Sequence, residues 1–498
     1  MTTSARPTTR TWPRRVLGAT LMLALGLATV AGVVFAGATE TGRSINQPVP
    51  SSAADTVPTS LQHAEPTSAA ESTAVRHGRP LVVAFVVGTS GTIASDLLAP
   101  YDIFASSPAF TTYVVSDVAS AAPLEGGPAV VPTYTFADVD ADPALTPDLV
   151  VVPALTHPTG ATEAPLRDWV TRQHDDGARV LGVCTGSLVL AATGMLDGLD
   201  ATSHWSRISA LESDHPNVHW MRGQRYVEDG SVTTTAAVTS GVPAALHLVA
   251  ELAGPDEAQR VANLHPELRW TPTQTTTIPK DHFAVHDWPV GLNYVMPWFR
   301  PTVGIALEEG VGELDATAAF EVYSQSAAAR TVALATSDTV RTRHGLVLLT
   351  TSFTHATGLS RVVVPGADTA DAVDPGLRAW ADAQRLSLEP LTGPPGPDGS
   401  AGEGGFSSAL QNLAAHTDAA TTSATAKMIG YPTSSLDLGN QPRSLRPILL
   451  GIVSLALAVL VGLAPTFLAR RWRRRGLLPA NASAAASLTD TETVNAAV

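Results

Sequence analysis

Short apolar runs alternate with stretches of helical spacing through the middle of this 498-residue chain. Runs of this kind, rich in valine and leucine, are typical of strands buried on both faces of a parallel sheet. The pattern predicts an α/β fold of the flavodoxin/Rossmann-like type, with helices on both faces of the sheet. The runs lie at residues 81–87, 112–116, 149–153 and 179–183, the helical patterns between them at 96–106 and 164–175, and a last strand and helix at 231–235 and 242–252.

The run at 179–183 leads into a turn that carries the single cysteine of the chain, Cys184. A side chain at such a strand-to-helix corner projects from the carboxyl edge of the sheet, where α/β folds place their chemistry. The helical pattern that follows, up to about Gly194, directs its positive end at the sulfur, which favours the thiolate. An isolated cysteine is also common as a small buried apolar residue, so its role depends on its partners.

Two longer apolar runs predict membrane-spanning helices, and the first of them is residues 16–38. It follows Arg6, Arg10, Arg14 and Arg15, and as a helix it would be about 34 Å long, enough to cross a bilayer. A cleaved signal peptide is the competing interpretation, because small residues end the run. We favour an uncleaved anchor and assign residues 1–38 to a cytoplasmic N-terminus with this anchor or signal.

The second run, 448–468, is followed at once by five arginines, Arg470, Arg471, Arg473, Arg474 and Arg475. A buried amphipathic helix is the alternative, but an uncharged run closed in this way favours a transmembrane helix at 447–469. The positive-inside rule puts both basic flanks, including a tail at 470–498, in the cytoplasm and the region between the helices outside. We therefore predict a two-pass protein of the cell membrane, with the lipid bilayer as a partner.

Charge is distributed unevenly along the chain. The terminal stretches 1–38 and 447–498 hold nine arginines and two acids, a net charge of +7 within an overall −14. The remaining −21 lies on 39–446, which argues against nucleic-acid binding. Within that region, 39–79 is rich in Ser, Thr, Ala, Pro and Glu without apolar periodicity, and we predict a disordered linker there. A single cysteine excludes an internal disulfide and a thiolate metal cluster.

The first half of the strand and helix pattern returns after a connector at 271–297. Where a second cysteine turn is expected, the chain has a flexible insert of glycine and proline instead. We predict a degenerate, shortened second copy over 298–435 that has no nucleophile; the alternative is that any two βα units look alike. The returning segments are the strands 302–307 and 361–366 and the helix 313–323, and the insert is 393–399.

Four segments carry a resemblance to a known family. On these segments residues 80–265 resemble the DJ-1/PfpI (ThiJ/PfpI) superfamily, which has a glutamine-amidotransferase-like fold, and we place the domain at 80–270. The branches that they resemble most are the amidase-like domain of AraC-type regulators and the isocyanide-hydratase-like proteins. The segments are the nucleophile elbow Gly182-Val183-Cys184-Thr185-Gly186, the first helix at 95–104, the Ala-Thr-Ser-His-Trp segment at 201–205, and the late strand and helix at 229–241.

The resemblance implies a role for each matching residue. It makes Cys184 the nucleophile and Asp96 the acid that approaches the sulfur, to hydrogen-bond the thiolate or to move a proton. His204 matches a histidine that some members hold near the nucleophile, with a surface or core histidine as the alternative. Thr185 is expected to donate its hydroxyl or backbone N–H to a developing oxyanion. Backbone groups at Gly186 and at Leu155 would support the same anion pocket.

Three positions depart from the family pattern. Thr185 follows the nucleophile where the peptidase branch has histidine, which removes most of the support for a protease. Ala154 and Leu155 stand where relatives commonly have two glycines, and both residues resist any geometry with positive φ. Ala99 replaces a glycine beside the acid. These departures bear on turnover and leave the predicted fold untouched.

No cofactor or metal site is predicted. His282 and His286 lie four apart, a spacing that can bind a metal on a helix. The nearby Pro279 and Pro289 and the lack of further ligands favour a solvated or packing role. The first strand is followed by Gly-Thr-Ser-Gly at 88–91, which lacks the spacing of a phosphate-binding or dinucleotide-binding loop.

The patterns predict a membrane-anchored, extracytoplasmic domain in which Cys184 attacks an unknown small C–N or carbonyl substrate. Asp96 would handle the proton, and the reaction would be a hydrolysis or a hydration. The alternative is a non-catalytic ligand or redox sensor, because the loop at Ala154 is altered and a lone thiolate outside the cell is easily oxidised. Relatives usually dimerise, so the second copy either occupies the place of the mate in an intramolecular pseudo-dimer or leaves room for a homodimer.

Overall fold

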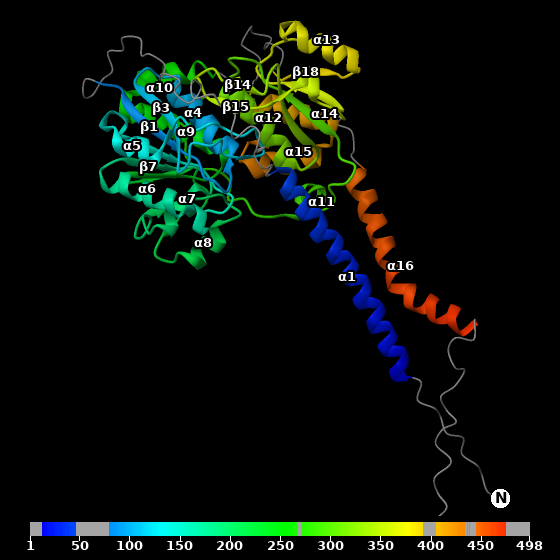
Figure 1. The fold of residues 1–498 in the computed structure, drawn as a ribbon. Coiled ribbons are helices and arrows are strands. Elements are labelled where there is room, and N and C mark those ends of the chain that lie inside the picture. The colour runs from blue at the N-terminus through cyan, green and yellow to red at the C-terminus, as the bar shows by residue number, and fades with distance from the viewer. Residues whose placement is uncertain are drawn as a thin grey trace, which may run out of the picture. The chain divides into compact units, whose positions relative to one another are not determined.

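The computed structural model describes residues 12–45, 79–265, 270–391, 405–433, 436, 438 and 445–474. The chain divides into two units. One unit, Thr39–Ser444, holds two parallel sheets and the helices that cover them (Figure 1). The other unit holds the helical parts of Met1–Ala38 and Leu445–Val498. The flexible insert expected at 393–399 lies outside the described residues.

The larger sheet has seven strands in the order β10-β11-β7-β6-β1-β3-β5. Its neighbours are parallel except at one edge, where β10 pairs antiparallel with β11. The register places Val83 of the central strand β1 opposite Thr112 of β3 and Leu149 of β6. The predicted α/β fold with a parallel sheet is confirmed. The strands are β1 (Leu81–Val86), β3 (Phe110–Ser116), β5 (Tyr134–Thr135), β6 (Leu149–Val152), β7 (Arg179–Gly182), β10 (Tyr226–Asp229) and β11 (Val232–Thr235).

Helices cover both faces of this sheet because its apolar side chains alternate between them. Val83 and Phe85 of β1 belong to one buried cluster, and Val82, Ala84 and Val86 belong to another. The first cluster includes residues of α4 (Ala94–Ala105), α9 (Val238–Ala253) and α10 (Pro255–Ala262), and the second includes residues of α5 (Phe136–Ala141), α6 (Ala164–Asp175) and α7 (Gly186–Ala192).

The smaller sheet has five parallel strands in the order β16-β13-β12-β17-β18. This order matches β5-β3-β1-β6-β7 of the larger sheet strand for strand. The strands are β12 (Thr302–Ala306), β13 (Arg330–Ala335), β16 (Thr351–Ser352), β17 (Arg361–Val364) and β18 (Leu388–Pro390). Residues of α12 (Glu313–Ser326), α14 (Gly405–His416) and α15 (Ala419–Ile429) share the first buried cluster with the larger sheet, and α13 (Pro375–Gln384) packs in a separate one.

Helices α4 and α12 pack against each other and join the two halves of the unit. The Ser95 hydroxyl of α4 donates to Oε2 of Glu321 in α12 at 2.7 Å. In return the N–H of Leu314, in the first turn of α12, donates to Oδ2 of Asp102 in α4 at 2.9 Å. Each helix therefore offers a carboxylate to the first turn of the other, and the contact is reciprocal.

Shorter elements complete the larger unit. Two helices, α8 and α11, lie in its connecting segments, and three pairs of very short strands form local two-stranded ladders. Their bounds are α8 (Ile208–Asp214), α11 (Trp288–Val295), β2 (Thr92–Ile93), β4 (Leu124–Glu125), β8 (Asp200–Ala201), β9 (His219–Trp220), β14 (Thr339–Arg341) and β15 (Val347–Leu349).

Helix α1 spans Trp12–Ile45, and its segment Met22–Ile45 is long and apolar enough to cross a membrane. Residues 39–45, which the sequence assigned to a disordered linker, continue this helix and belong to the larger unit. That assignment was wrong for these residues because tertiary contacts hold them: the Thr41 hydroxyl donates to the carbonyl of Tyr294 at 2.7 Å. The rest of the predicted linker, 46–78, lies outside the described residues.

Helix α16 spans Arg446–Arg474. Its apolar segment within the described part, Ile448–Ala464, is shorter than that of α1, so the second crossing stays a prediction. Within the smaller unit α1 and α16 approach closely at two glycines. A Cβ on Gly462 would stand 2.9 Å from the carbonyl oxygen of Met22, and one on Gly26 would stand 3.5 Å from that of Ala458.

Candidate functional site

The turn at Cys184 joins a buried strand to a short helix. Cys184 has a φ of 53°, in the left-handed region that residues with a side chain rarely adopt. Gly186 begins α7 and donates its N–H to the carbonyl of Val183 at 2.7 Å. A Cβ on Gly186 would stand 2.0 Å from the carbonyl oxygen of Val152, so only glycine lets the helix begin this close to β6.

The backbone of Cys184 is held on both sides. Its N–H donates to the hydroxyl of Thr235 at 2.9 Å. Its carbonyl accepts from the hydroxyls of Ser187 at 3.1 Å and Ser203 at 3.4 Å. The residue is 7% exposed. A strained φ persists only when the surroundings hold it, and such residues cluster at functional sites.

The sulfur of Cys184 is a thiol in this environment. Burial raises the pKa of Cys184 well above its usual value, and the nearby carboxyl of Asp96 raises it further. The backbone N–H of Thr185 and the charge of Arg207 act in the opposite direction but do not outweigh them. The expectation of a resting thiolate therefore fails, because desolvation and neighbouring acids exceed the effect of a short helix N-terminus.

Asp96 reaches the same place from the first turn of α4. Its side chain is fully buried, and Oδ2 accepts the N–H of Ala154 at 3.1 Å. Its other oxygen, Oδ1, has no hydrogen-bond partner among the described residues. Burial, followed by the charge of Glu321, raises the pKa of Asp96 well above its usual value, which favours the protonated form of this carboxyl.

The altered loop after β6 is not strained. Neither Ala154 nor Leu155 has a positive φ, so the glycines of the relatives are not required for this geometry. The carbonyl of Ala154 accepts the N–H of Ile93 at 2.9 Å, and Leu155 bridges to Thr92. The loop uses its N–H at Ala154 to hold Asp96 and thereby positions the acid.

Two further acids join this group and were missed by the sequence analysis. Glu321 of α12 is 1% exposed, its charge raises the pKa of both Asp96 and Cys184, and burial raises its own pKa to about 7. Glu125 lies close enough to raise the pKa of Asp96 and of Glu321 in turn. Glu321 could have been found by aligning 314–323 with 95–104, because it then falls on the position of Asp102.

His204 is placed differently from the expectation. Its Nε2 donates to the carbonyl of Met428 at 2.8 Å, and its Nδ1 accepts from the hydroxyl of Ser206 at 2.7 Å. Burial lowers its pKa, so the ring is neutral. Both ring nitrogens are thus engaged, neither of them with Cys184, and His204 acts as a support for α15.

The end of α15 lies on the segment that carries His204. The last carbonyl groups of a helix lack hydrogen-bond partners inside the helix. At the end of α15, side chains of the first half donate hydrogen bonds to these carbonyls. Trp205 Nε1 donates to the carbonyl of Lys427 at 3.3 Å, and the Thr239 hydroxyl donates to that of Ile429 at 3.0 Å. With His204 on Met428, three consecutive carbonyls are capped, so α15 is fixed next to the Cys184 turn.

The proposed oxyanion donors differ in availability. The N–H of Gly186 is used by the carbonyl of Val183, and Leu155 forms an isolated bridge to Thr92. The N–H of Thr185 is directed at the sulfur of Cys184. Thr185 is therefore the donor best placed to meet charge that develops on an atom bonded to that sulfur.

The DJ-1/PfpI family model matches residues 82–251, the region that contains the Cys184 turn and Asp96. Isonitrile hydratase from Pseudomonas putida is 36% identical over 173 residues, which are 33% of this chain and 70% of that protein. The chain belongs to the DJ-1/PfpI family. The HTH-type transcriptional regulator CdhR from Pseudomonas aeruginosa is 33% identical over 142 residues, which are 28% of this chain and 41% of the regulator.

Solved structures are also similar to part of this chain. A ThiJ/PfpI family protein from Pseudomonas syringae is 29% identical, with a TM-score of 0.35, over 40% of this chain and 81% of that one. An AraC family transcriptional regulator from Pseudomonas putida is 18% identical, with a TM-score of 0.33, over 37% of this chain and 99% of that one.

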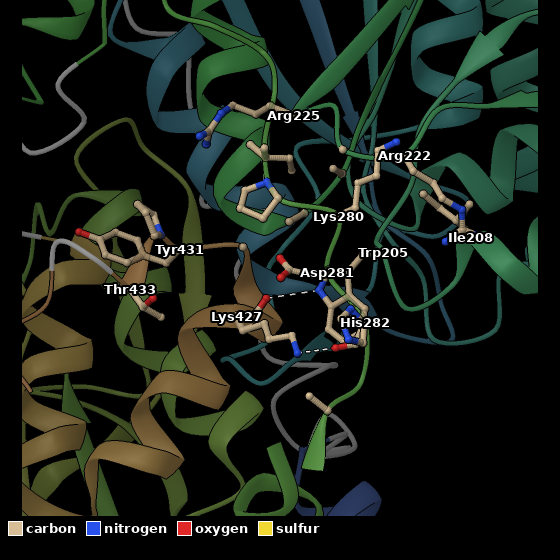
Figure 2. Close-up of a pocket in the computed structure, with 18 of the residues that line it drawn as sticks. Trp205, Ile208, Arg222, Arg225, Lys280, Asp281, His282, Lys427, Tyr431 and Thr433 are labelled. Carbon is tan, nitrogen blue, oxygen red and sulfur yellow. Dashed lines mark hydrogen bonds between the residues drawn. The ribbon is translucent and has the colours of Figure 1, made fainter. Parts of the chain in front are cut away.

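A pocket of about 500 Å³ lies in this DJ-1/PfpI protein (Figure 2), and we call it the polar pocket after the charged side chains in its lining. Its wall includes Ser203, whose hydroxyl donates to the carbonyl of Cys184, and Lys427 at the end of α15. Neither Cys184 nor Asp96 is among the described residues that line it. The pocket therefore adjoins the turn without opening onto the sulfur. Charged groups of both signs line it, among them Arg222, Arg225, Lys280, Asp281 and Asp287.

A buried ionic cluster joins α4 to the second half of the molecule. Nδ1 of His344 lies 2.9 Å from Glu313 Oε2 and 3.4 Å from Asp102 Oδ1. These three residues have the ligand types and separation that could hold a divalent cation. His282 and His286 both line the polar pocket, and the side chain of His286 is 75% exposed.

Proposed function

We propose that this DJ-1/PfpI protein is an enzyme that adds water to a small substrate containing a C–N multiple bond or a carbonyl group, with Cys184 as the nucleophile. The observation that carries the proposal is the strained left-handed turn at Cys184, buried beside Asp96, whose pKa is raised well above its usual value. The similarity to isonitrile hydratase over 70% of that protein supports the choice of a C–N substrate.

The chemistry follows from the protonation states of the two side chains. As the sulfur of Cys184 forms a bond to the substrate carbon, Asp96 gives its proton to the substrate and receives the thiol proton. Water then adds to the same carbon, the S–C bond breaks, and the sulfur regains a proton. The net change is the addition of one water molecule, with no oxidation or reduction. The Thr185 N–H would stabilise charge that develops during these steps.

The burial of the site supports a small substrate. Cys184 is 7% exposed, and α12 and α15 lie against the elements that carry it. A large polymer such as a polypeptide would need these helices to separate, which agrees with the poor match to the peptidase branch at Thr185.

The experiment compares the full-length protein in nanodiscs with the variants Cys184→Ser and Asp96→Asn on aliphatic isonitriles and nitriles. We expect turnover of at least one class, and a loss of roughly 10³-fold or more in kcat in Cys184→Ser, because the nucleophile and the acid act as a unit. Asp96→Asn keeps the shape and removes the proton donor, so its kcat should fall as well. Turnover by Cys184→Ser at the rate of the unchanged protein would refute the proposal.

A ligand sensor without turnover is the second candidate. The polar pocket beside the turn and the similarity to a transcriptional regulator support it. The raised pKa of the Cys184 thiol disfavours the redox version of this idea, since oxidation proceeds through the thiolate. If no substrate class turns over, mass spectrometry after mild peroxide treatment separates the two versions: sulfenic acid at Cys184 favours redox sensing, and its absence favours ligand sensing.

We also propose that the second half is a degenerate DJ-1/PfpI copy that takes the place of a dimer mate. The matching strand orders and the reciprocal α4–α12 contact support this. Asp315 also occupies the position in the second half that Asp96 occupies in the first. Asp315 lies beside Gly366, as Asp96 lies beside Ala154. A homodimer in which Glu321 of one copy lies beside Cys184 of another would contradict it.

Finally, we propose a two-pass anchor with both termini in the cytoplasm. The apolar span of α1, the five arginines that follow the second apolar run and the close approach of the two helices at Gly26 and Gly462 support it. Alkaline phosphatase fused after Val498 should be inactive and green fluorescent protein at that position should be fluorescent. Active phosphatase there would place the C-terminus outside and reverse the proposed orientation.

A further inference from the structure

An apolar cavity of about 660 Å³ lies between the connector and α15 and shares Ala284 and Asp287 with the lining of the polar pocket. Its volume is within the range of sites that hold small molecules. The residues that line it include Gly42 and Ile45 of α1, Trp288 and Tyr294 of α11, and Ala424 and Met428 of α15. Met428 is also the residue whose carbonyl accepts from His204.

The rim of this cavity is unusually apolar for a protein surface. Phe283 is 67% exposed, Val285 89%, Trp288 46% and Tyr294 40%, and all four line the cavity. Exposed apolar residues gathered in one place mark a binding surface rather than random scatter. Aromatic residues of this kind are enriched where proteins meet the boundary between a bilayer and water.

The cavity lies where the membrane-spanning segment of α1 ends. The segment long enough to cross a bilayer is Met22–Ile45, and its last turn forms part of the cavity wall. Two hydrogen bonds fix this turn to the larger unit: Thr41 to the carbonyl of Tyr294, and the N–H of Gly126 to the carbonyl of Ile45 at 3.1 Å. These bonds make the end of α1 a fixed part of the cavity wall.

We propose that this cavity binds the acyl chain of a lipid from the surrounding bilayer. The inference rests on the membrane anchorage proposed above and is independent of the reactivity of Cys184. The lining offers few charged groups, and Asp287 among them is already paired with Lys427 at 2.7 Å. The segment that follows Ile45, residues 46–78, is rich in serine, threonine and proline and is a poor match for an apolar site. An acyl chain entering from the bilayer matches both the lining and the position.

The test uses the full-length protein in nanodiscs that contain phosphatidylcholine with a photoreactive diazirine at the end of one acyl chain. After irradiation, mass spectrometry locates the labelled residues. We expect label on Ala424 and Met428, which line the cavity, in addition to label on α1. Ala424 is 2% exposed, so contact with the outer surface of the bilayer does not account for label there.

Gly291→Trp provides the decisive variant, because Gly291 lines the cavity and a Cβ on it meets nothing within 4 Å. The indole would occupy space that the chain needs, and excluding about two methylenes lowers occupancy by about tenfold. Label at Ala424 and Met428 should fall by that factor, while label on α1 stays unchanged. Ala137→Trp, at an exposed position of α5, is the matched control and should change neither.

The possible results separate the two proposals. Label on α1 without label on Ala424 or Met428 would overturn the lipid site and leave the anchor intact, whereas absence of label on α1 would overturn the anchor and the site together. Label at Ala424 that is unaffected by Gly291→Trp would also overturn the lipid site. Cys184→Ser should label as the unchanged protein does, which keeps this test independent of the enzymatic proposal.

Discussion

Replacing Gly186 with alanine is expected to be among the most damaging single-methyl changes in this protein. The added Cβ would stand 2.0 Å from the carbonyl oxygen of Val152, a backbone atom of the central sheet that cannot rotate away. Either α7 must shift or β6 must bend, and overpacking of this kind costs about 3 kcal/mol or more when backbone has to move. The turn that holds Cys184 would be the first element to lose its geometry.

The measurement is the thermal unfolding midpoint of the full-length protein in detergent, followed by intrinsic fluorescence. Gly291→Ala is the control, because a Cβ there meets nothing within 4 Å and alanine favours the helix by about 1 kcal/mol. The midpoint should fall clearly in Gly186→Ala and stay level or rise slightly in Gly291→Ala. An unchanged midpoint in Gly186→Ala would mean that α7 begins farther from β6 than described.

Glu321→Gln is expected to stabilise the protein above neutral pH. Burial raises the pKa of Glu321 from 4.5 in the unfolded chain to about 7. Below pH 4.5 Glu321 is protonated in both the folded and the unfolded protein. Between pH 4.5 and pH 7 it ionises in the unfolded chain but not in the folded protein, so the free energy of unfolding falls as pH rises. Above pH 7 the loss is complete and amounts to about 3 kcal/mol. Glutamine does not ionise, retains an oxygen to accept from Ser95, and avoids this loss.

Unfolding midpoints of both proteins at pH 5 and pH 8 check this prediction. The two should be similar at pH 5, and the variant should unfold at higher temperature at pH 8. Alkylation of Cys184 by iodoacetamide at pH 8 should also be faster in the variant, because the charge of Glu321 raises the pKa of Cys184. Equal midpoints at both pH values would show that Glu321 is not buried beside Asp96.

Glu389→Gln serves as the control of opposite sign. Despite partial burial, hydrogen bonds from Asn412 and Ser387 hold the pKa of Glu389 below its usual range. An acid with a lowered pKa contributes stability above the pKa of the unfolded chain. Its replacement should therefore lower the midpoint at pH 8, where the replacement of Glu321 raises it.

The sequence predicted local structure well where capping and periodicity decide it. Helix α6 begins and ends where the pattern placed it, at Ala164–Asp175, with Pro165 in its first turn and Gly177 just beyond its end. Apolar runs and helical spacing likewise predicted strand β1 and helix α12 of the second half. The predicted end of β1 differs from the observed end by one residue, and that of α12 by three. These features depend on neighbours in the chain, so the sequence contains them directly.

The parts that the sequence analysis missed depend on contacts between distant segments. Glu321 accepts a hydrogen bond from Ser95, which lies 226 residues away in the sequence, and no local sequence pattern predicts that contact. The thiolate expected at Cys184 came from the adjacent helix, whereas the state of the sulfur is decided by burial under both halves and by two carboxyls from other elements. Residues 39–45 were assigned to a linker because their composition is polar, and tertiary hydrogen bonds make them helical.

The reciprocal hydrogen bonds between α4 and α12 make the fraction of complete sites independent of the concentration of the protein. A centre shared between separate subunits is complete only when the protein is concentrated enough to associate. Here Asp96, Cys184 and Glu321 are encoded in a single polypeptide, so each molecule carries the whole set from the moment it folds. A scarce protein dispersed in a large membrane would keep the same fraction of intact centres as an abundant one.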